Sequence, residues 1–268
     1  MRNLYFSDLK RILKDKLFMV TCILAGAFAL VNPLLNKLLF EILDLGELLG
    51  STVNAKSMLF SAFLPSDNLG LVMPILLSIV VCKDFSQGTV RNKIISGKSR
   101  TVIYLSHLLS CATVICSVML AHALLTLLFS LCFFDYQDAA FCAADFGYLL
   151  ASLLFAMVVY FAISAIVAFF ATCAKNAGIC ILLYLAVALG LSIIGAIFQV
   201  AAAFLDTETV AFKIVEFINA LNFYTSTLIG AGSSYGIKDI VYILLSPVIV
   251  SGGVTVLGMR IFSRKNLK

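Results

Sequence analysis

The chain of 268 residues is 62% apolar and only 12% charged, and it carries a formal net charge of +5. Soluble globular domains contain about 45–50% apolar and about 25% charged residues, so this composition excludes an ordinary soluble domain. The charges cluster between long uncharged runs, which indicates an all-α integral membrane protein with several spans.

The first predicted element, residues 1–16, is an amphipathic helix ahead of the first apolar run. On a helical wheel, apolar side chains share one face and polar side chains share the opposite face. The apolar face holds Tyr5, Phe6, Leu9, Ile12, Leu13 and Leu17, and the polar face holds Ser7, Asp8, Arg11, Lys14 and Asp15. This pattern predicts an interfacial helix whose basic groups face anionic lipid headgroups. A solvated extension of the first span is the alternative.

Residues 17–268 form one predicted transmembrane domain, and each of its spans needs about 20 mostly apolar residues. We expect six spans, near 17–40, 69–83, within 101–134, and near 146–173, 177–204 and 239–259. The first apolar run continues past the small residues at 25–27, which favours an uncleaved span over a signal peptide. The second is short for a bilayer, and a break at 65–67 separates it from the apolar stretch 58–64. The third is too long, so we expect it to tilt or to project into the cytosol.

Lysine and arginine predict the orientation, because cytoplasmic loops of membrane proteins carry an excess of them. With six spans, one side holds all of the 19 basic residues except Lys37, Lys56, Lys213 and Lys238. Both termini and the loop after the second span are therefore expected in the cytoplasm.

The segment 206–238, between the fifth and sixth spans, is expected outside and is amphipathic. We predict short helices lying on or in the outer leaflet, and an aromatic-rich loop packed on the spans is the alternative. The apolar residues that support this prediction are Phe212, Ile214, Val215, Phe217, Ile218, Leu221, Phe223 and Tyr224.

Two stretches resemble catalytic motifs, and neither is complete. The run NKIISGKS misses the phosphate-binding pattern G-x-x-x-x-G-K-S/T because Asn92 stands in place of the first glycine, and a membrane span precedes it instead of a buried strand. The run GSSYG at 232–236 fits G-x-S-x-G, but neither His107 nor His122 is an obvious base for Ser234. We therefore expect that this chain is not an enzyme and binds no metal and no cofactor.

The eight cysteines do not indicate a disulfide scaffold, because most lie in apolar runs where a thiol behaves as a small apolar group. No C-x-x-C pair occurs, so a structural zinc site lacks support. Cys132 and Cys142 flank one short loop, and two readings stay open for them: a disulfide on an oxidising side, or two free thiols.

The uncharged polar side chains inside the predicted spans carry hydroxyl, amide or imidazole groups. Asn32 and Asn36 near the outer end of the first span, and Gln199 near that of the fifth, are candidates for lining a cavity. Hydrogen bonding between helices is the alternative role. For His122 we expect such an interhelical hydrogen bond.

The cytoplasmic stretch DFSQGTVRNKIISGKSR, from Asp84 to Arg100, combines charges, apolar residues and glycines. Gly88 and Gly97 bracket about two helical turns. A short helix held between two spans would act as a rigid lever that docks into a groove on a cytoplasmic partner. An ordinary basic loop that obeys the positive-inside rule is the alternative.

The run D-F-x-x-G-T-V-R-N-K-I-I-S-G-K-S-R-x-x-I-Y, from Asp84 to Tyr104, resembles the cytoplasmic segment of ABC-2 type permeases, the membrane subunits of bacterial ABC exporters. The six expected spans, the N-terminal helix and the outer amphipathic segment match the same family. The resemblance implies a coupling helix at about 84–96 that docks on a separate ATPase. Many family members have glutamate where this chain has Asp84. The residues that would couple to the ATPase are Asp84, Phe85, Gly88, Thr89, Arg91, Asn92, Lys93, Ile94, Gly97 and Arg100.

The same resemblance implies the assembly and the cargo. Two permease chains, identical or different, would pair in a bacterial plasma membrane with two ATPase subunits, which bind ATP and magnesium. Small permeases of this kind resemble exporters of peptides such as toxins, bacteriocins or lantibiotics. An amphipathic or hydrophobic cargo is expected, and a nucleic-acid partner is not.

Two other classes of protein stay as alternatives. A membrane-embedded serine-type protease would use Ser234. An ATP-independent secondary transporter would show inverted repeats or buried acids, and the halves 1–134 and 135–268 show no convincing repeat.

Overall fold

The computed structural model describes residues 2–42, 54–66, 69–136, 143–174, 176–205, 209–225 and 237–265. All regular secondary structure in these ranges is α-helical, which confirms the predicted all-α fold. The helices are α1 (Arg2–Lys14), α2 (Lys16–Ile42), α4 (Ala55–Ser61), α5 (Leu69–Ser86), α6 (Thr89–Ile95), α7 (Arg100–Ser130), α8 (Ala143–Cys173), α9 (Ala177–Phe204), α10 (Val210–Leu221) and α11 (Ile237–Arg264).

Five of the described helices, α2, α7, α8, α9 and α11, are long and apolar enough to cross a membrane. The sequence predicted six such spans. The difference concerns the second predicted span, near 69–83, which corresponds to α5. Helix α5 is a candidate span only when it is taken together with α6, and the two helices meet at a bend of 50°. The described residues therefore hold five candidate spans, or six if the bent pair counts as one.

Helix α8 is the most enclosed span. Its apolar stretch is 61% buried, compared with 22% for α2 and 17% for α9 and α11. It packs against α5, α7, α9 and α11 through a series of buried small residues, including Ala156, Ala162, Ala165, Ala168 and Ala171. Small side chains let helix backbones approach closely, which is the main source of helix association in a membrane.

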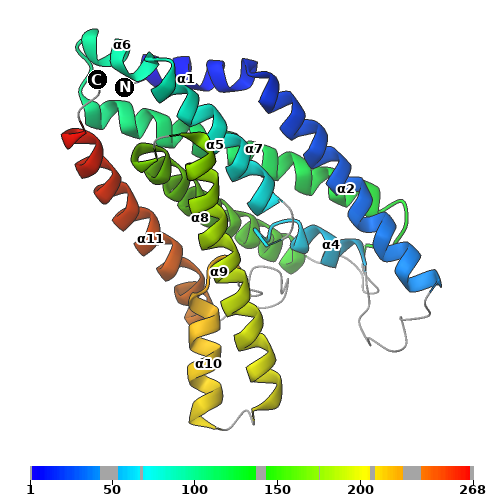
Figure 1. The fold of residues 1–268 in the computed structure, drawn as a ribbon. Coiled ribbons are helices and arrows are strands. Elements are labelled where there is room, and N and C mark those ends of the chain that lie inside the picture. Colours follow the sequence, from blue (N-terminus) through cyan, green and yellow to red (C-terminus); the bar gives the residue numbers. More distant parts are fainter. Residues whose placement is uncertain are drawn as a thin grey trace.

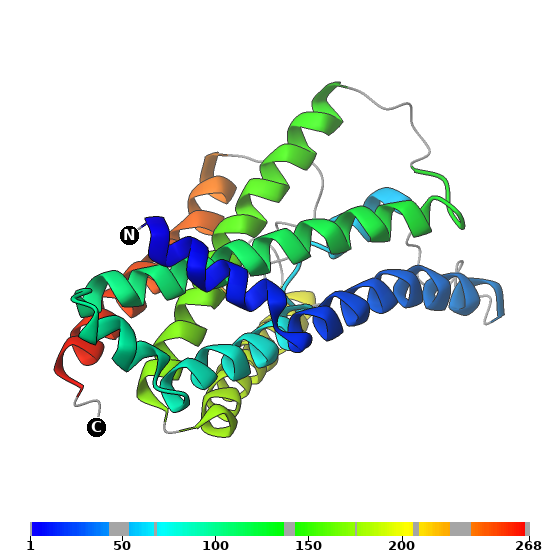
Figure 2. The same ribbon diagram turned by 90° about the horizontal axis from the view of Figure 1, so that it is seen from above.

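The two ends of the described chain lie together. The start of α1 and the end of α11 are at the same end of the molecule as α6 (Figure 1). Seen from above, α1 crosses the first half of α7 (Figure 2), and the two helices are in contact. This arrangement gathers α1, α6 and the start of α7 at one end of the helix bundle.

Helices α9 and α10 run side by side and project beyond the other helices at the opposite end (Figure 1). Asn222 joins them, because its Nδ2 donates to the carbonyl of Leu191 at 2.8 Å. Helix α10 confirms a short helix within the predicted outer segment 206–238, and residues 206–208 and 226–236 of that segment lie outside the described ranges.

Helix α5 continues through Pro74 because another helix satisfies the carbonyl group that the proline leaves free. Proline has no N–H, so the carbonyl of Gly70, four residues earlier, has no partner within its own helix. The hydroxyl of Tyr184 on α9 donates a hydrogen bond to this carbonyl. Both groups are buried, where an unpaired carbonyl is costly, so this bond joins α9 to α5.

Candidate functional site: the junction of α6 with α1, α5 and α7

Two glycines set the bounds of α6. Gly88 has φ of +70° and Gly97 has φ of +81°, in the left-handed region that glycine enters at no steric cost. They flank the seven residues of α6, which confirms the predicted short helix between them. The predicted range 84–96 was too long at its start, however, because Asp84, Phe85 and Ser86 belong to the last turn of α5.

Helix α6 has one exposed side and one anchored side. Arg91, Asn92 and Ile95 are exposed, and Ile95 shows 73% of its surface. Val90 is fully buried among residues of α7, α8 and α11, and Ile94 packs at the edge of the same cluster. The exposed side can therefore meet another molecule while the opposite side holds the helix in place.

Lys93 attaches α6 to α1. Its ammonium group forms an ion pair with Asp8, a carboxylate that is only 1% exposed. The hydroxyl of Ser106 on α7 donates to the other oxygen of Asp8 at 2.7 Å. The sequence prediction for Asp8 was wrong: the helical wheel placed this residue on the exposed polar face of α1. It is buried because its two partners come from α6 and α7.

Asp84 attaches the end of α5 to α1. It is 2% exposed and forms an ion pair with Arg11. His107 of α7 lies between the two ion pairs, with its Nδ1 3.4 Å from Asp84 Oδ2 and its Nε2 3.3 Å from Lys93 Nζ. Because an ammonium group can only donate, this geometry makes Nε2 the acceptor and leaves the ring proton on Nδ1, towards Asp84.

A third ion pair lies at the corner between α1 and α2. Asp15 accepts a hydrogen bond from the backbone N–H of Leu17 at 3.0 Å and so caps the start of α2. Its other oxygen lies 3.0 Å from Nζ of Lys83 on α5. The Leu17 N–H, together with Lys83, holds the pKa of Asp15 below its ordinary value despite partial burial. The α1–α2 corner is thereby fixed to α5.

Asp8, Asp84 and His107 are also the kind of residues that bind metal ions, and their ligand atoms lie within 4.8 Å of one another. Both carboxylates already face a cation, Lys93 for Asp8 and Arg11 for Asp84. A metal ion would have to displace these two side chains. The arrangement fits a charge network that holds four helices together better than it fits a metal site.

The ten predicted coupling residues differ in their exposure and in their contacts. Arg91, Asn92 and Gly97 are exposed, whereas Asp84 and Lys93 are held in the network described above. Phe85 packs edge-on against Phe262 of α11, with ring centroids 5.9 Å apart. The remaining members, Gly88, Thr89, Ile94 and Arg100, are partly buried.

Arg100 holds the end of α11. Its guanidinium donates to the carbonyls of Ser263 at 3.0 Å and Lys265 at 2.6 Å. Lys265 in turn donates to the carbonyl of Thr172 at the end of α8, at 2.6 Å. Arg100 thus joins the start of α7 to the ends of two other helices, instead of projecting towards a partner molecule.

The predicted cavity-lining residues lie on two helices, Asn32 and Asn36 on α2 and Gln199 on α9. Asn36 donates to the carbonyl of Asn32 at 2.9 Å and lies 3.9 Å from the sulfur of Met58 on α4, so it connects α2 to α4. Gln199 is exposed on α9.

The interhelical hydrogen bond predicted for His122 is confirmed, since its Nδ1 lies 2.8 Å from the carbonyl of Ala25 on α2. Ser234 and Cys142 fall outside the described residues.

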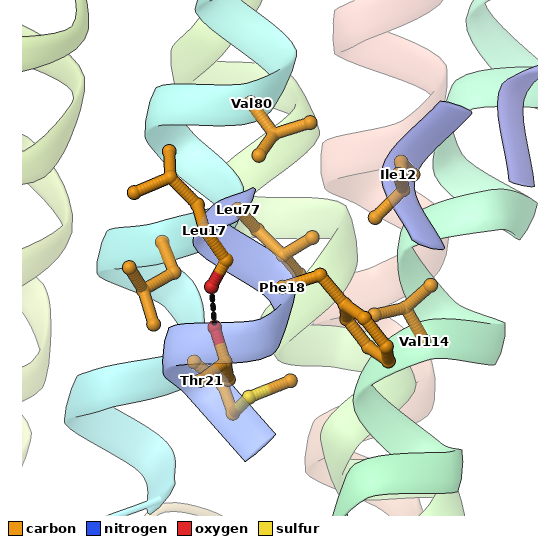
Figure 3. Close-up of a pocket in the computed structure, with 9 residues that line it drawn as sticks. Ile12, Leu17, Phe18, Thr21, Leu77, Val80 and Val114 are labelled. Atoms are coloured by element: carbon orange, nitrogen blue, oxygen red, sulfur yellow. Dashed lines mark hydrogen bonds between the residues drawn. The ribbon is translucent and has the colours of Figure 1, made fainter. Parts of the chain in front are cut away.

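A small apolar cavity lies where α1, α2, α5 and α7 meet (Figure 3). Ile12, Phe18, Leu77 and Val114 are among its lining residues, and its volume is about 10 Å³, close to that of one water-sized sphere. Thr21, at its edge, satisfies its hydroxyl by donating to the carbonyl of Leu17 at 2.7 Å. The junction next to the charge network is therefore closely packed, and this cavity cannot admit a peptide.

Sequence reasoning missed the network, although two signals pointed to it. Asp8 is an acid on an otherwise basic helix, and His107 is an ionisable residue near the end of an apolar run.

Comparison with models of known protein families finds no match, and no curated protein matches the chain.

Proposed function

We propose that this chain is the permease subunit of an ATP-driven ABC exporter in a bacterial plasma membrane. One observation carries the proposal: α6 is a short helix with an exposed outer side, and buried charges fix its inner side to α1 and α7. A helix held in this way suits the transfer of force from an ATPase. The resemblance of the stretch Asp84 to Tyr104 to the coupling segment of ABC-2 type permeases supports the same function.

The proposed mechanism follows the contacts of α6. Binding of ATP and magnesium by a separate ATPase subunit would bring two ATPases together and push on α6. The ion pair between Lys93 and Asp8 would pass the movement to α1. The ion pair between Asp84 and Arg11 would make the end of α5 move together with α1. Charged groups at low exposure resist separation, because each would be left without a partner. The helices that α6 contacts would then move as one body.

The proposed assembly contains two permease chains, identical or different, and two ATPases. The cargo is an amphipathic or hydrophobic molecule, with peptides such as toxins, bacteriocins or lantibiotics as the favoured class. It would pass along a surface between the two permeases. Exposed apolar side chains along α2, α9 and α11 are suited to contact lipid or a second chain. The chain itself carries out no chemistry in this proposal.

The proposed topology has six crossings, with both termini and α6 in the cytoplasm. In this topology α5 is the second span, although it is short. Its 18 residues extend about 27 Å, which is close to the roughly 30 Å of a hydrocarbon core.

Copurification tests the proposal. The tagged chain is expressed with the ATPase encoded beside it, extracted in detergent and assayed for ATP hydrolysis. We expect the ATPase to be retained, and Arg91→Glu on the exposed side of α6 to reduce this retention. Lys213→Glu is the matched control, because Lys213 is an exposed lysine on α10 at the other end of the molecule. Failure of the unchanged chain to retain an ATPase would contradict the proposal.

A further inference from the structure

An open hollow lies beside α6. It has a volume of about 420 Å³ and is lined by Arg2, Asn3, Leu4 and Ser7 of α1, and by Lys98 from the loop between α6 and α7. Arg2, Asn3, Ser7 and Lys98 are exposed. The hollow is thus formed by two segments, the first two turns of α1 and the loop after α6, that the ion pair between Lys93 and Asp8 holds together.

The exposed charges of this region have one sign. Arg2, Arg91 and Lys98 are all exposed cations. The acids at this end of the described chain point to other helices: Asp8 and Asp84 are buried, and Asp15 pairs with Lys83. The local potential is therefore positive, and two large apolar side chains of this region are exposed, Ile95 on α6 by 73% and Phe6 on α1 by 55%.

The position of the hollow favours a protein partner over a lipid surface. The buried charged groups that contact Ser106 and His107 show that this part of α7 lies in a polar environment. Helix α7 begins at Arg100, which lies about 9 Å from Ser106 along the helix axis, and Lys98 precedes it in the loop. Helix α7 is also 31 residues long, about 46 Å, and so exceeds a hydrocarbon core of about 30 Å. If this excess lies at the end of α7 that carries the buried charges, its first turns extend past the hydrocarbon and the hollow lies beyond them.

We propose that α6 and the first two turns of α1 form a single docking surface for an acidic region of the ATPase. This inference rests on the proposed function and adds the chemistry of the partner. An aspartate or glutamate side chain of the ATPase enters the hollow and pairs with Arg2 and Lys98. Ile95 and Arg91 contact an apolar patch with an acidic rim. Complementary charge of this kind sets which ATPase the permease accepts and speeds their association.

Zero-length cross-linking of the copurified complex tests the contact at Lys98 directly. A carbodiimide joins an ammonium group to a carboxylate only when the two are in contact, and mass spectrometry of the product identifies both residues. We expect a bond between Lys98 and an aspartate or glutamate of the ATPase. Lys98→Arg keeps the charge but not the reactive amine, so it should retain the ATPase and lose the cross-link.

Charge reversal gives an independent readout. We expect Lys98→Glu and Arg2→Glu each to lower the retained ATPase about tenfold, and retention by the unchanged chain to fall as salt is raised. Lys14→Glu is the matched control, since Lys14 is an exposed lysine at the far end of α1 and should change retention less than twofold. The elution profile and thermal unfolding of each variant permease, purified alone, exclude misfolding.

The outcomes separate this inference from the proposed function. An unchanged chain that retains no ATPase contradicts the proposed function, and the docking inference with it. A chain that retains the ATPase, with Lys98→Glu and Arg2→Glu both within twofold of it, overturns the docking inference alone. The same follows if these variants lose bound anionic phospholipid but keep the ATPase, because the hollow would then be a headgroup site.

Discussion

At the scale of single residues, the ion pair between Arg11 and Asp84 should contribute measurably to stability. Asp84 is 2% exposed and Arg11 is about one-third exposed, so removing the carboxylate leaves a cation in a poorly hydrated place. We predict that Asp84→Asn lowers stability by about 2 kcal/mol, measured by thermal unfolding in detergent.

A double-variant cycle separates pairing from other effects of this substitution. Arg11→Met removes the cation, so Asp84→Asn should cost markedly less in an Arg11→Met background than in the unchanged chain. Equal costs in the two backgrounds would show that the pair contributes nothing and that Asp84 acts through His107 instead.

Asp15 gives a prediction about pH. Its pKa lies below the ordinary value, so the native chain favours the carboxylate, and the stabilisation is complete above the unfolded-state pKa of about 4. It is lost as the pH falls through the lower native pKa. Asp15→Asn keeps an acceptor for the N–H of Leu17 and cannot titrate. The difference in melting temperature between the two proteins should be constant from pH 7 to about pH 5 and shrink below about pH 4. A difference that stays constant down to pH 3 would contradict the assignment.

The sequence identified several residues of this site, but it did not predict their surroundings in the folded chain. It marked Asp84, Arg91 and Lys93 as functional, and all three lie at the junction. It placed Asp8 in solvent because a helical wheel describes one helix at a time. The partners of Asp8 are Lys93 and Ser106, which are 85 and 98 residues away along the chain. Contacts at such separations are set by tertiary packing, and local periodicity does not contain them.

At the scale of elements, helix α5 depends on a hydrogen bond from its neighbour α9. Tyr184→Phe would leave the carbonyl of Gly70 unpaired in an apolar interior, and we predict a loss of about 1–2 kcal/mol in thermal unfolding. Pro74→Ala supplies the missing N–H, so Tyr184→Phe should cost much less in that background. An unchanged cost in the Pro74→Ala background would show that the hydroxyl stabilises something other than α5.

The contact between α7 and α11 depends on a glycine. A Cβ atom at Gly258 would overlap the hydroxyl of Tyr104 and lie 2.6 Å from its Cζ, in a cluster where Tyr104 is 2% exposed. We predict that Gly258→Ala lowers stability by about 1–3 kcal/mol through overpacking. Gly253, on the same helix, has no neighbour within 4 Å of such a Cβ. Gly253→Ala should therefore be neutral or stabilising by up to about 1 kcal/mol, because alanine favours helix. Equal effects of the two substitutions would contradict close packing at Gly258.

Helix bounds followed from the sequence where a residue type enforces them. Gly88 and Gly97 predicted both ends of α6, because each adopts a positive φ that other residues avoid. The start of the predicted coupling segment was misplaced because Asp84 and Phe85 carry no such signal. Asp84 was assigned to the coupling segment, yet in the structure it continues α5 and is buried.

At the scale of the whole molecule, the path of the chain bears on the number of crossings. Helix α2 leaves the charge network at Asp15, and its far part meets α4 through Asn36 and Met58. The chain then returns along α5, whose end meets Arg11 of α1 through Asp84. Helix α5 therefore runs back towards α1, opposite in direction to α2, although it has 18 residues and α2 has 27. This path fits the proposed topology of six crossings, in which α2 and α5 both cross the membrane.

Reporter fusions test this topology. Alkaline phosphatase is active only outside the cytoplasm, and green fluorescent protein fluoresces only within it. We predict fluorescence for fusions after Ser96 and after Lys268, and phosphatase activity for a fusion after Tyr136, where α7 has ended. Active phosphatase after Ser96 would place α6 outside and remove its access to an ATPase. Fluorescence after Ser96 combined with active phosphatase after Lys268 would mean that α6 is cytoplasmic but that the crossings after it are odd in number. That result would conflict with the bonds from Arg100, at the start of α7, to the last turn of α11, because they hold the end of α11 beside α6.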